Sequence, residues 1–208
     1  MKSFLVTFIS GILMVMLYSL QGADEPPVSQ SKGKVPKQNR RIDLPYRLPN
    51  NYPEPRKILR QHFPRTANQC CFKGGWGYDP EHAVIVLEFD PEINPDQKFD
   101  GVSLEYAFID KRIREELIFS RPKGKRFAEV GHKVIKQKLL NLNGVPHDFI
   151  EVQVFAYPEK EWNELKADWE AHDGYKNDPK GRKENLKRKE ACKITYRTVF
   201  WFNIKKFF

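Results

Sequence analysis

The segment 68–86, NQCCFKGGWGYDPEHAVIV, holds the residue types in this chain that are best suited to chemistry. Cys70 and Cys71 are adjacent, a glycine-rich stretch with Trp76 follows, and His82 stands just before an apolar run. A thiolate beside a histidine is a nucleophile and base pair, but nothing in the spacing places a histidine next to either cysteine. The glycines lack the Gly-Lys-Ser/Thr ending of a phosphate loop, and a strand-like run follows them instead of a helix. The segment is therefore interpreted as a turn that leads into a strand.

The three cysteines favour cross-linking if the chain is exported. A bond between Cys70 and Cys71 would be strained, so the sequence predicts that one of them pairs with Cys192, just before the last apolar run. Such a bond would stabilise the fold by about 2–4 kcal/mol and leave one thiol over. Free buried thiols are the alternative, while a zinc site is disfavoured because the Cys-x2-Cys spacing is absent.

Acidic side chains on or beside expected strands offer a hydrolase as an alternative function. Asp100 and Glu151 are the candidates, with His82 as a separate candidate base. Catalysis needs groups that converge on one point, and the spacing of these residues does not indicate convergence. No catalytic residue, cofactor or metal is therefore assigned, and a non-enzyme is favoured over an enzyme.

The elements that would position these residues follow an apolar N-terminus. Lys2 precedes an apolar run over 4–20, and acidic residues follow at 24–25, which is the charge order of a secretory signal. Residues 1–23 are predicted to be a signal peptide. An uncleaved membrane anchor is the alternative, because about 18 apolar residues can span a bilayer. In both cases we expect the rest of the chain to be exported, to the periplasm or the extracellular space.

Residues 24–66 are rich in proline and in basic side chains. Proline removes backbone donors and interrupts helices and sheets, so this segment is predicted to be a linker or an arm laid on a surface. A short helix is expected at 55–62, with Pro55 at its first position. Part of the arm is expected to dock through its larger side chains, Leu44, Tyr46, Leu48 and Tyr52.

The net charge of +9 is unevenly distributed along the chain. The excess lies in the segments 24–65 and 180–208, whereas 66–179 is net acidic. A domain that binds nucleic acid is expected to carry a basic stripe beside stacking aromatic residues, so no specific nucleic acid is predicted. The basic segments are interpreted as solvated tails, and association with a polyanion through them is the alternative.

A single α+β domain is predicted over 67–208. Strands are expected at 83–89, 102–110, 113–120, 149–157 and 193–204. Alternating apolar residues predict that 102–110 and 113–120 form a hairpin, in which Glu115 interrupts the apolar face. The run 193–204 is apolar on both faces, which is typical of a central strand.

The segment 127–142 is compatible with two structures. Its apolar residues lie near helical spacing, but it also precedes Asn143-Gly144, the strongest short hairpin signal when apolar runs flank it. The sequence favours a strand pair that turns at Asn143-Gly144 over a helix.

Two helices are expected near the C-terminus. In 159–172, Trp162, Leu165 and Trp169 share one stripe, which predicts an amphipathic helix. The highly charged segment 179–191 is expected to be an exposed helix. The predicted fold is therefore a mostly antiparallel sheet of five to six strands packed against the helix 159–172.

These observations favour an exported, soluble domain that acts as a non-enzymatic binding or structural protein of the cell envelope or the extracellular space. The partner would be an unidentified protein or envelope component, and the membrane would be contacted only through an uncleaved N-terminal segment. The predicted interaction surface consists of Trp76, Tyr78, Arg182, Lys183, Lys187 and Arg188.

Overall fold

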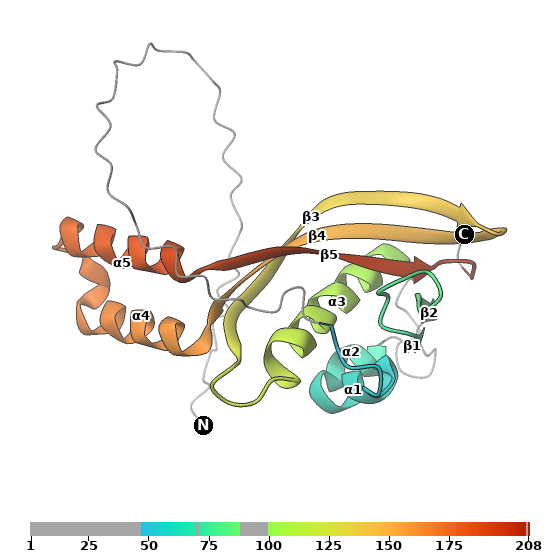
Figure 1. The fold of residues 1–208 in the computed structure, drawn as a ribbon, viewed down its shortest axis with the longest axis horizontal. Helices are drawn as coiled ribbons and strands as arrows, with labels where there is room; N and C mark the ends of the chain where they lie inside the picture. Colours follow the sequence, from blue (N-terminus) through green and yellow to red (C-terminus); the bar gives the residue numbers. More distant parts are fainter. Residues whose placement is uncertain (1–46, 70, 88–99, 207) are drawn as a thin grey trace, which may run out of the picture. The chain divides into compact units, whose positions relative to one another are not determined.

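The computed structural model describes residues 47–69, 71–87, 100–206 and 208. The chain divides into two compact units, 1–41 and 42–208, and all described residues belong to the second. In the described part of the chain, no helix has the length and apolar character needed to cross a membrane. Figure 1 shows the elements in their colours along the sequence.

A five-stranded sheet of order β1-β2-β5-β4-β3 forms the framework of the described residues. The strands are β1 Cys71–Gly74, β2 Val84–Leu87, β3 Phe127–Leu142, β4 Val145–Pro158 and β5 Ile194–Asn203. β2 and β5 run parallel, and the other three pairs are antiparallel. The α+β class is confirmed, and the sheet is mixed rather than purely antiparallel. The last strand occupies an interior position between β2 and β4, as the apolar character of both its faces predicted.

The helices fall into three groups. Short helices α1 Pro55–His62 and α2 Pro64–Gln69 precede the sheet, and α3 Gly101–Arg114 runs directly into the π-helix η1 Glu115–Phe119. The third group is α4 Glu159–Ala171, the 3₁₀ turn η2 Asp173–Tyr175 and α5 Pro179–Cys192. α1 begins at Pro55 as predicted.

The prediction of a strand hairpin over 102–120 is wrong, because this segment is helical throughout. Asp100 caps the helix by accepting a hydrogen bond from the backbone N–H of Ser103. Leu104 and Phe108 recur at the four-residue spacing of one helix face, and both are buried. The apparent alternation of period two arose because every second residue of this helix happens to be apolar from Val102 to Phe108.

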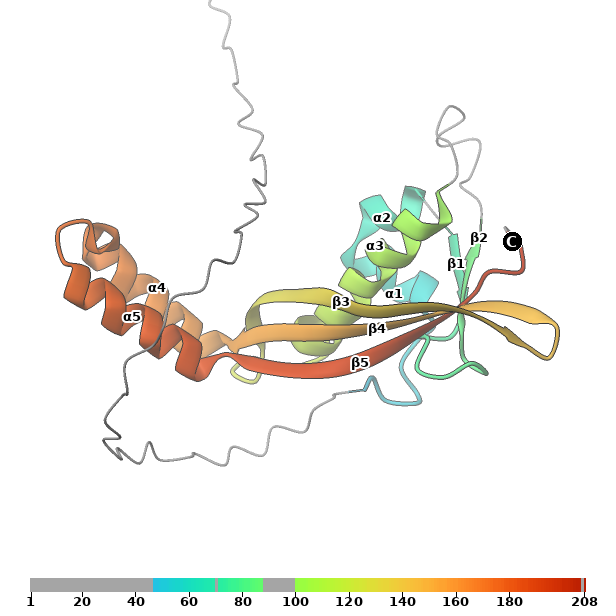
Figure 2. The same cartoon turned by 90° about the horizontal axis from the view of Figure 1, so that it is seen from above.

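The helix that covers the sheet is α3 with η1, which corrects the prediction that 159–172 does so. Figure 2 shows α3 lying along one face of the sheet, while α4 and α5 extend beyond its end as a helical hairpin. The core joins apolar residues of α3 and η1 to the strands beneath them: Phe108, Ile109, Ile113, Leu117, Ile150, Val152, Val154, Phe200 and Phe202.

The strand pair turning at Asn143-Gly144 is confirmed, and the helix alternative for 127–142 is excluded. Asn143 and Gly144 have φ values of 53° and 79°, and both lie in the left-handed region. A two-residue turn with two positive φ angles matches the twist of the strands that it joins. The turn therefore sets the register of β3 against β4.

Replacing Gly144 with alanine should lower the free energy of unfolding by about 1 kcal/mol, because an L side chain at φ 79° is strained. A Cβ atom at Gly144 would meet no atom within 4 Å, so the cost comes from the backbone alone. Urea denaturation measures the effect. Asn143→Gly is the matched control and should leave stability nearly unchanged; equal losses for the two variants would contradict this explanation.

The predicted helices 159–172 and 179–191 are also confirmed as α4 and α5. α5 is an exposed helix, and Asn185 is its only buried residue. The Nδ2 atom of Asn185 donates a 2.9 Å hydrogen bond to Oδ2 of Asp168 in α4. Leu186, the leucine of this helix, is 48% exposed.

The folded unit includes residues upstream of position 67. Leu48, Ile58 and Leu59 are buried in the same core as α3, and Tyr52 packs against it. The C-terminal part of the predicted arm is thus bound to the domain, while Leu44 and Tyr46 lie outside the described residues.

Candidate functional site

A buried ion pair lies where α3 meets η1. The side chain of Arg112 has no exposed surface, and that of Glu116, one turn later, is 1% exposed. The wider turn of the π-helix also brings Glu115 into the interior, where it is fully buried. Because π-turns are frequent at functional positions, this cluster is a candidate site.

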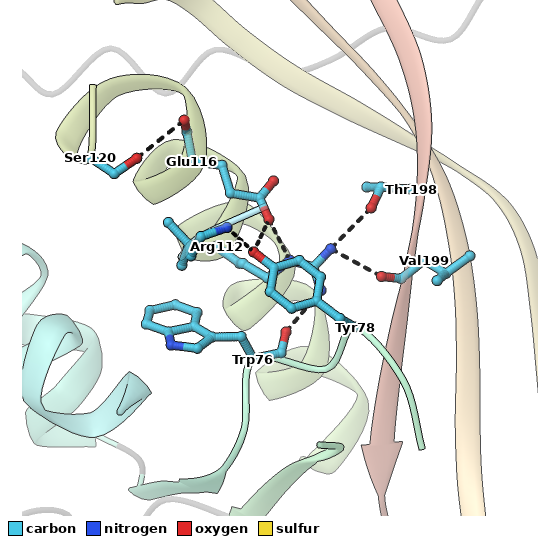
Figure 3. Close-up of polar contacts among 8 residues, drawn as sticks. Trp76, Tyr78, Arg112, Glu116, Ser120, Thr198 and Val199 are labelled. Atoms are coloured by element: carbon cyan, nitrogen blue, oxygen red, sulfur yellow. Dashed lines mark hydrogen bonds and ion pairs between the residues drawn. The ribbon is translucent and has the colours of Figure 1, made fainter. Parts of the chain in front are cut away.

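Neighbouring groups hold the guanidinium of Arg112 on several sides (Figure 3). Its Nε lies 3.1 Å from Oε1 of Glu116. Its Nη1 donates to the carbonyl of Trp76 at 2.8 Å, and its Nη2 donates to Oγ1 of Thr198 at 3.1 Å and to the carbonyl of Val199 at 3.0 Å. Arg112 therefore joins the glycine-rich turn, the covering helix and β5.

Two aromatic rings also contact this guanidinium. The Cζ atom of Arg112 lies 3.5 Å from the ring centre of Phe200 and 4.3 Å from that of Tyr78. The hydroxyl of Tyr78 donates to Oε1 of Glu116 at 2.6 Å and accepts from the backbone N–H of Leu48 at 2.8 Å. The cluster thus extends to the segment that precedes α1.

Burial determines the electrostatics of the cluster. It raises the pKa of Glu116, and the positive charge of Arg112 acts against this rise. It lowers the pKa of Arg112, and Glu116 opposes that change. Burial, and after it the charge of Glu116, raise the pKa of Tyr78, so the phenol stays protonated as a donor. Arg112 and Glu116 are fully enclosed by neighbouring groups, so removing one of the two charges would leave the other buried without a partner.

Glu115 makes a second set of contacts with the N-terminal segment. It accepts hydrogen bonds from the hydroxyl of Tyr52 and, over 2.7 Å, from Nδ1 of His62. The ring of His62 stacks on Phe119, with 4.4 Å between ring centres. The acidic residue that interrupted an expected strand face is therefore a buried acceptor that binds α1 to η1.

A cavity of about 590 Å³ lies beside the buried cluster. Its walls include Tyr52, Trp76 and Tyr78, together with His82 and Asp79. The Nδ1 atom of His82 lies 2.7 Å from Oδ1 of Asp79, a geometry in which a carboxylate orients an imidazole. The described lining contains no serine, threonine or cysteine, and its two phenol hydroxyls, those of Tyr52 and Tyr78, donate hydrogen bonds to Glu115 and Glu116.

The sheet face opposite α3 is the second candidate site, here called the open face. Strand register defines it by three sets of outward residues: Gly131, Lys133, Lys136, Lys138 and Leu140 on β3, His147, Phe149, Glu151, Gln153 and Phe155 on β4, and Thr195, Arg197, Val199, Trp201 and Asn203 on β5. Among them His147 alone is buried. The helices α1, α2 and α3 lie on the other side of the sheet (Figure 2).

A β-bulge aligns the lysines of the open face. The register shifts between Val134 and Lys136, which leaves Ile135 without a partner. In a regular strand Lys133 and Lys136 would point to opposite faces, because side chains alternate. With the extra residue, Lys133 pairs with Gln153 and Lys136 with Glu151, so both lie on the same face.

The open face is basic and partly aromatic. Lys133, Lys136, Lys138 and Arg197 are its basic residues, and Glu151 is its acidic residue. Arg197 lies 3.5 Å from Glu151. The rings of Phe149 and Trp201 meet edge to face, with centres 4.9 Å apart. A surface with this balance of charge attracts anionic partners.

The predicted interaction residues fall into two separate places. Trp76 is 7% exposed and Tyr78 is half-buried, and both line the cavity beside the buried cluster. The basic residues Arg182, Lys183, Lys187 and Arg188 are exposed on α5, which extends away from the sheet.

The predicted bond to Cys192 is not formed, and Cys192 is a free cysteine. The register explains why. β2 runs parallel to β5 with Val84 beside Phe202, and Cys71 is paired with Leu87, beyond the C-terminal end of β5. Cys192 precedes the other end of this ten-residue strand, so the separation far exceeds the roughly 7 Å limit between Cα atoms. Cys70 lies outside the described residues.

The hydrolase candidates are not brought together. Asp100 caps α3 on the covered side of the sheet, whereas Glu151 pairs with Arg197 on the open face. His82 is part of the connection between β1 and β2. Among the described residues, no group of three or more histidine, cysteine, aspartate or glutamate side chains is placed to hold a metal ion.

Sequence reasoning missed Arg112, Glu115 and Glu116 because it assigned them to a strand. Arg112 and Glu116 are four residues apart, the spacing of an ion pair on one helix face, and this was the available signal. Comparison with known proteins adds no assignment: no protein family, curated protein or solved structure matches this chain.

Proposed function

We propose that this chain is an exported, non-enzymatic binding protein that holds an anionic partner on its open face. The observation that carries the proposal is the common orientation of Lys133, Lys136 and Lys138 beside Arg197 on a face that α3 leaves uncovered. Export is supported by the apolar N-terminal segment 1–23 in the sequence.

Lysines on an edge strand also prevent unwanted strand pairing, and β3 is an edge strand. That role does not require the lysines to share a face. It also does not account for Arg197, which lies on the interior strand β5. The shared orientation therefore favours a surface for a partner over protection of the edge alone.

The basic terminal segments, which include α5, are the alternative place for an anionic partner to bind. α5 carries many basic residues, but it also carries Glu184 and Glu190, and its charges surround an exposed helix. The open face instead gathers its basic residues in adjacent rows of a rigid sheet. We therefore expect the open face, and not α5, to determine retention on an anionic surface.

Two charge-reversal variants with equal change in net charge test this expectation. Lys133, Lys136 and Lys138 are replaced by glutamate in one, and Lys183, Lys187 and Arg188 of α5 in the other. On a heparin column at neutral pH, the open-face variant should elute at markedly lower salt than the α5 variant, because clustered charges release more counterions. Circular dichroism controls for folding. Equal elution of the two variants, or a larger loss for α5, would reject the proposed face.

A further inference from the structure

We infer that the open face binds a linear acidic polysaccharide, an inference that rests on the proposed binding of an anionic partner. The face is divided by chemistry. Its lysines lie along β3, while the rows on β4 and β5 offer hydrogen-bonding groups such as Gln153, Glu151 and Thr195. Lysines suit carboxylate or sulfate groups, and the neighbouring amide, carboxylate and hydroxyl groups suit sugar hydroxyls.

Residues that face each other on adjacent strands form rows across the sheet. In each of the three rows that contain a lysine of β3, the lysine lies beside a polar or aromatic residue of β4. Lys133, Gln153 and Arg197 form one row across the three strands, and Lys138, Phe149 and Trp201 form another. A repeating polymer that carries one anionic group and several hydroxyls per unit would meet both kinds of group along its length. A compact anion such as inorganic phosphate would contact only one row.

The aromatic pair favours a saccharide over a nucleic acid. Single-stranded nucleic acids bind on rings to which successive bases can stack. Phe149 and Trp201 meet at 65°, so they do not form two parallel platforms. Glu151 in the middle of the face pairs with Arg197, and its carboxylate can accept hydrogen bonds from sugar hydroxyl groups.

The geometry sets a minimum ligand length. Lys133 and Lys138 are separated by about 15 Å along β3, from the rise of about 3.3 Å per residue and the bulge between them. A saccharide must span this distance to contact all three lysines at once. We therefore expect affinity to rise with oligosaccharide length until that span is reached and then to level off.

Calorimetric titration of the full chain with size-fractionated heparin oligosaccharides tests the inference. Neutral dextran oligosaccharides and oligo(dT) of matched charge are the comparison ligands. Replacing the three lysines by glutamine should weaken heparin binding about tenfold or more. Gln153→Met leaves the charge unchanged and should weaken heparin binding about fivefold by removing a hydrogen-bonding amide, with no effect on oligo(dT).

The outcomes separate this inference from the proposed function. Oligo(dT) that binds as tightly as heparin, or a Gln153→Met variant that keeps full heparin affinity, overturns the polysaccharide and leaves the open face as a general anion-binding surface. Heparin binding that the lysine substitutions do not weaken overturns both. Affinity that does not depend on length up to the expected span also overturns the inference.

Discussion

Replacing Arg112 with methionine lowers the free energy of unfolding by about 3–5 kcal/mol, the cost of leaving one partner of a buried ion pair alone. The carboxylate of Glu116 would remain in the interior without its cation. The substitution also removes the donors to Trp76 and Thr198, which lie on two other elements. Urea denaturation of the parent and the variant measures the difference.

A second variant separates the uncompensated charge from the lost packing. In Arg112→Met/Glu116→Gln the charge is removed from both positions, and glutamine can still accept the hydrogen bond from Tyr78. We expect the double variant to recover more than half of the loss, since buried ion pairs can be replaced by neutral groups at little cost. A double variant as unstable as the single one would show that the contacts of Arg112 with Trp76, Thr198 and the enclosing rings matter more than its charge.

This cluster also shows why part of the fold was not readable from the sequence. Hydropathy patterns identify core positions by apolar residues, but α3 and η1 place Glu105, Arg112, Glu115 and Glu116 in the interior. Each polar residue at a core position weakens the helical period. The alternation of apolar residues from Val102 to Phe108 is then the stronger pattern, and it predicts a strand where the chain forms a helix.

Sequence signals predicted the structure correctly where a few neighbouring residues fix the backbone conformation. Asn143-Gly144 fixes a hairpin through its backbone angles, and Pro55 starts a helix because its own φ is already set. The position of α4 relative to the sheet depends on tertiary packing, and there the prediction failed. Helical periodicity shows that a helix has an apolar stripe but not which element that stripe will contact.

The open face depends on the bulge beside Ile135. A regular alternation would assign Lys133 and Lys136 to opposite faces, so a count of charges along the chain cannot reveal their alignment. The segment 66–179 is net acidic as a whole, yet it supplies the three lysines of this basic face. Charge summed over a segment and charge gathered on one face are different quantities.

The contribution of Glu105 to the stability of the domain should fall as pH rises from about 4.5 to about 8. Glu105 lies on α3 with no exposed surface. Burial, and after it the negative charge of Asp148, raise the pKa of Glu105 from 4.5 to about 8. In this range the unfolded chain loses the proton of Glu105 while the folded protein keeps it. The unfolded state then binds fewer protons, so stability decreases by up to about 1.4 kcal/mol per pH unit and levels off above pH 8.

Glu105→Gln removes this dependence, because glutamine has the shape of the protonated acid and does not titrate. The variant and the parent should have similar free energies of unfolding near pH 4.5. As pH rises to about 8, the variant should become increasingly more stable than the parent. Urea denaturation at pH 5, 6.5, 8 and 9 measures the difference, with Glu184→Gln on the exposed helix α5 as the matched control. The difference between variant and parent cancels the titration of the other groups. A constant difference across this pH range would mean that Glu105 is already ionised in the folded protein, and that Asp148 and the interior around it accommodate a second negative charge.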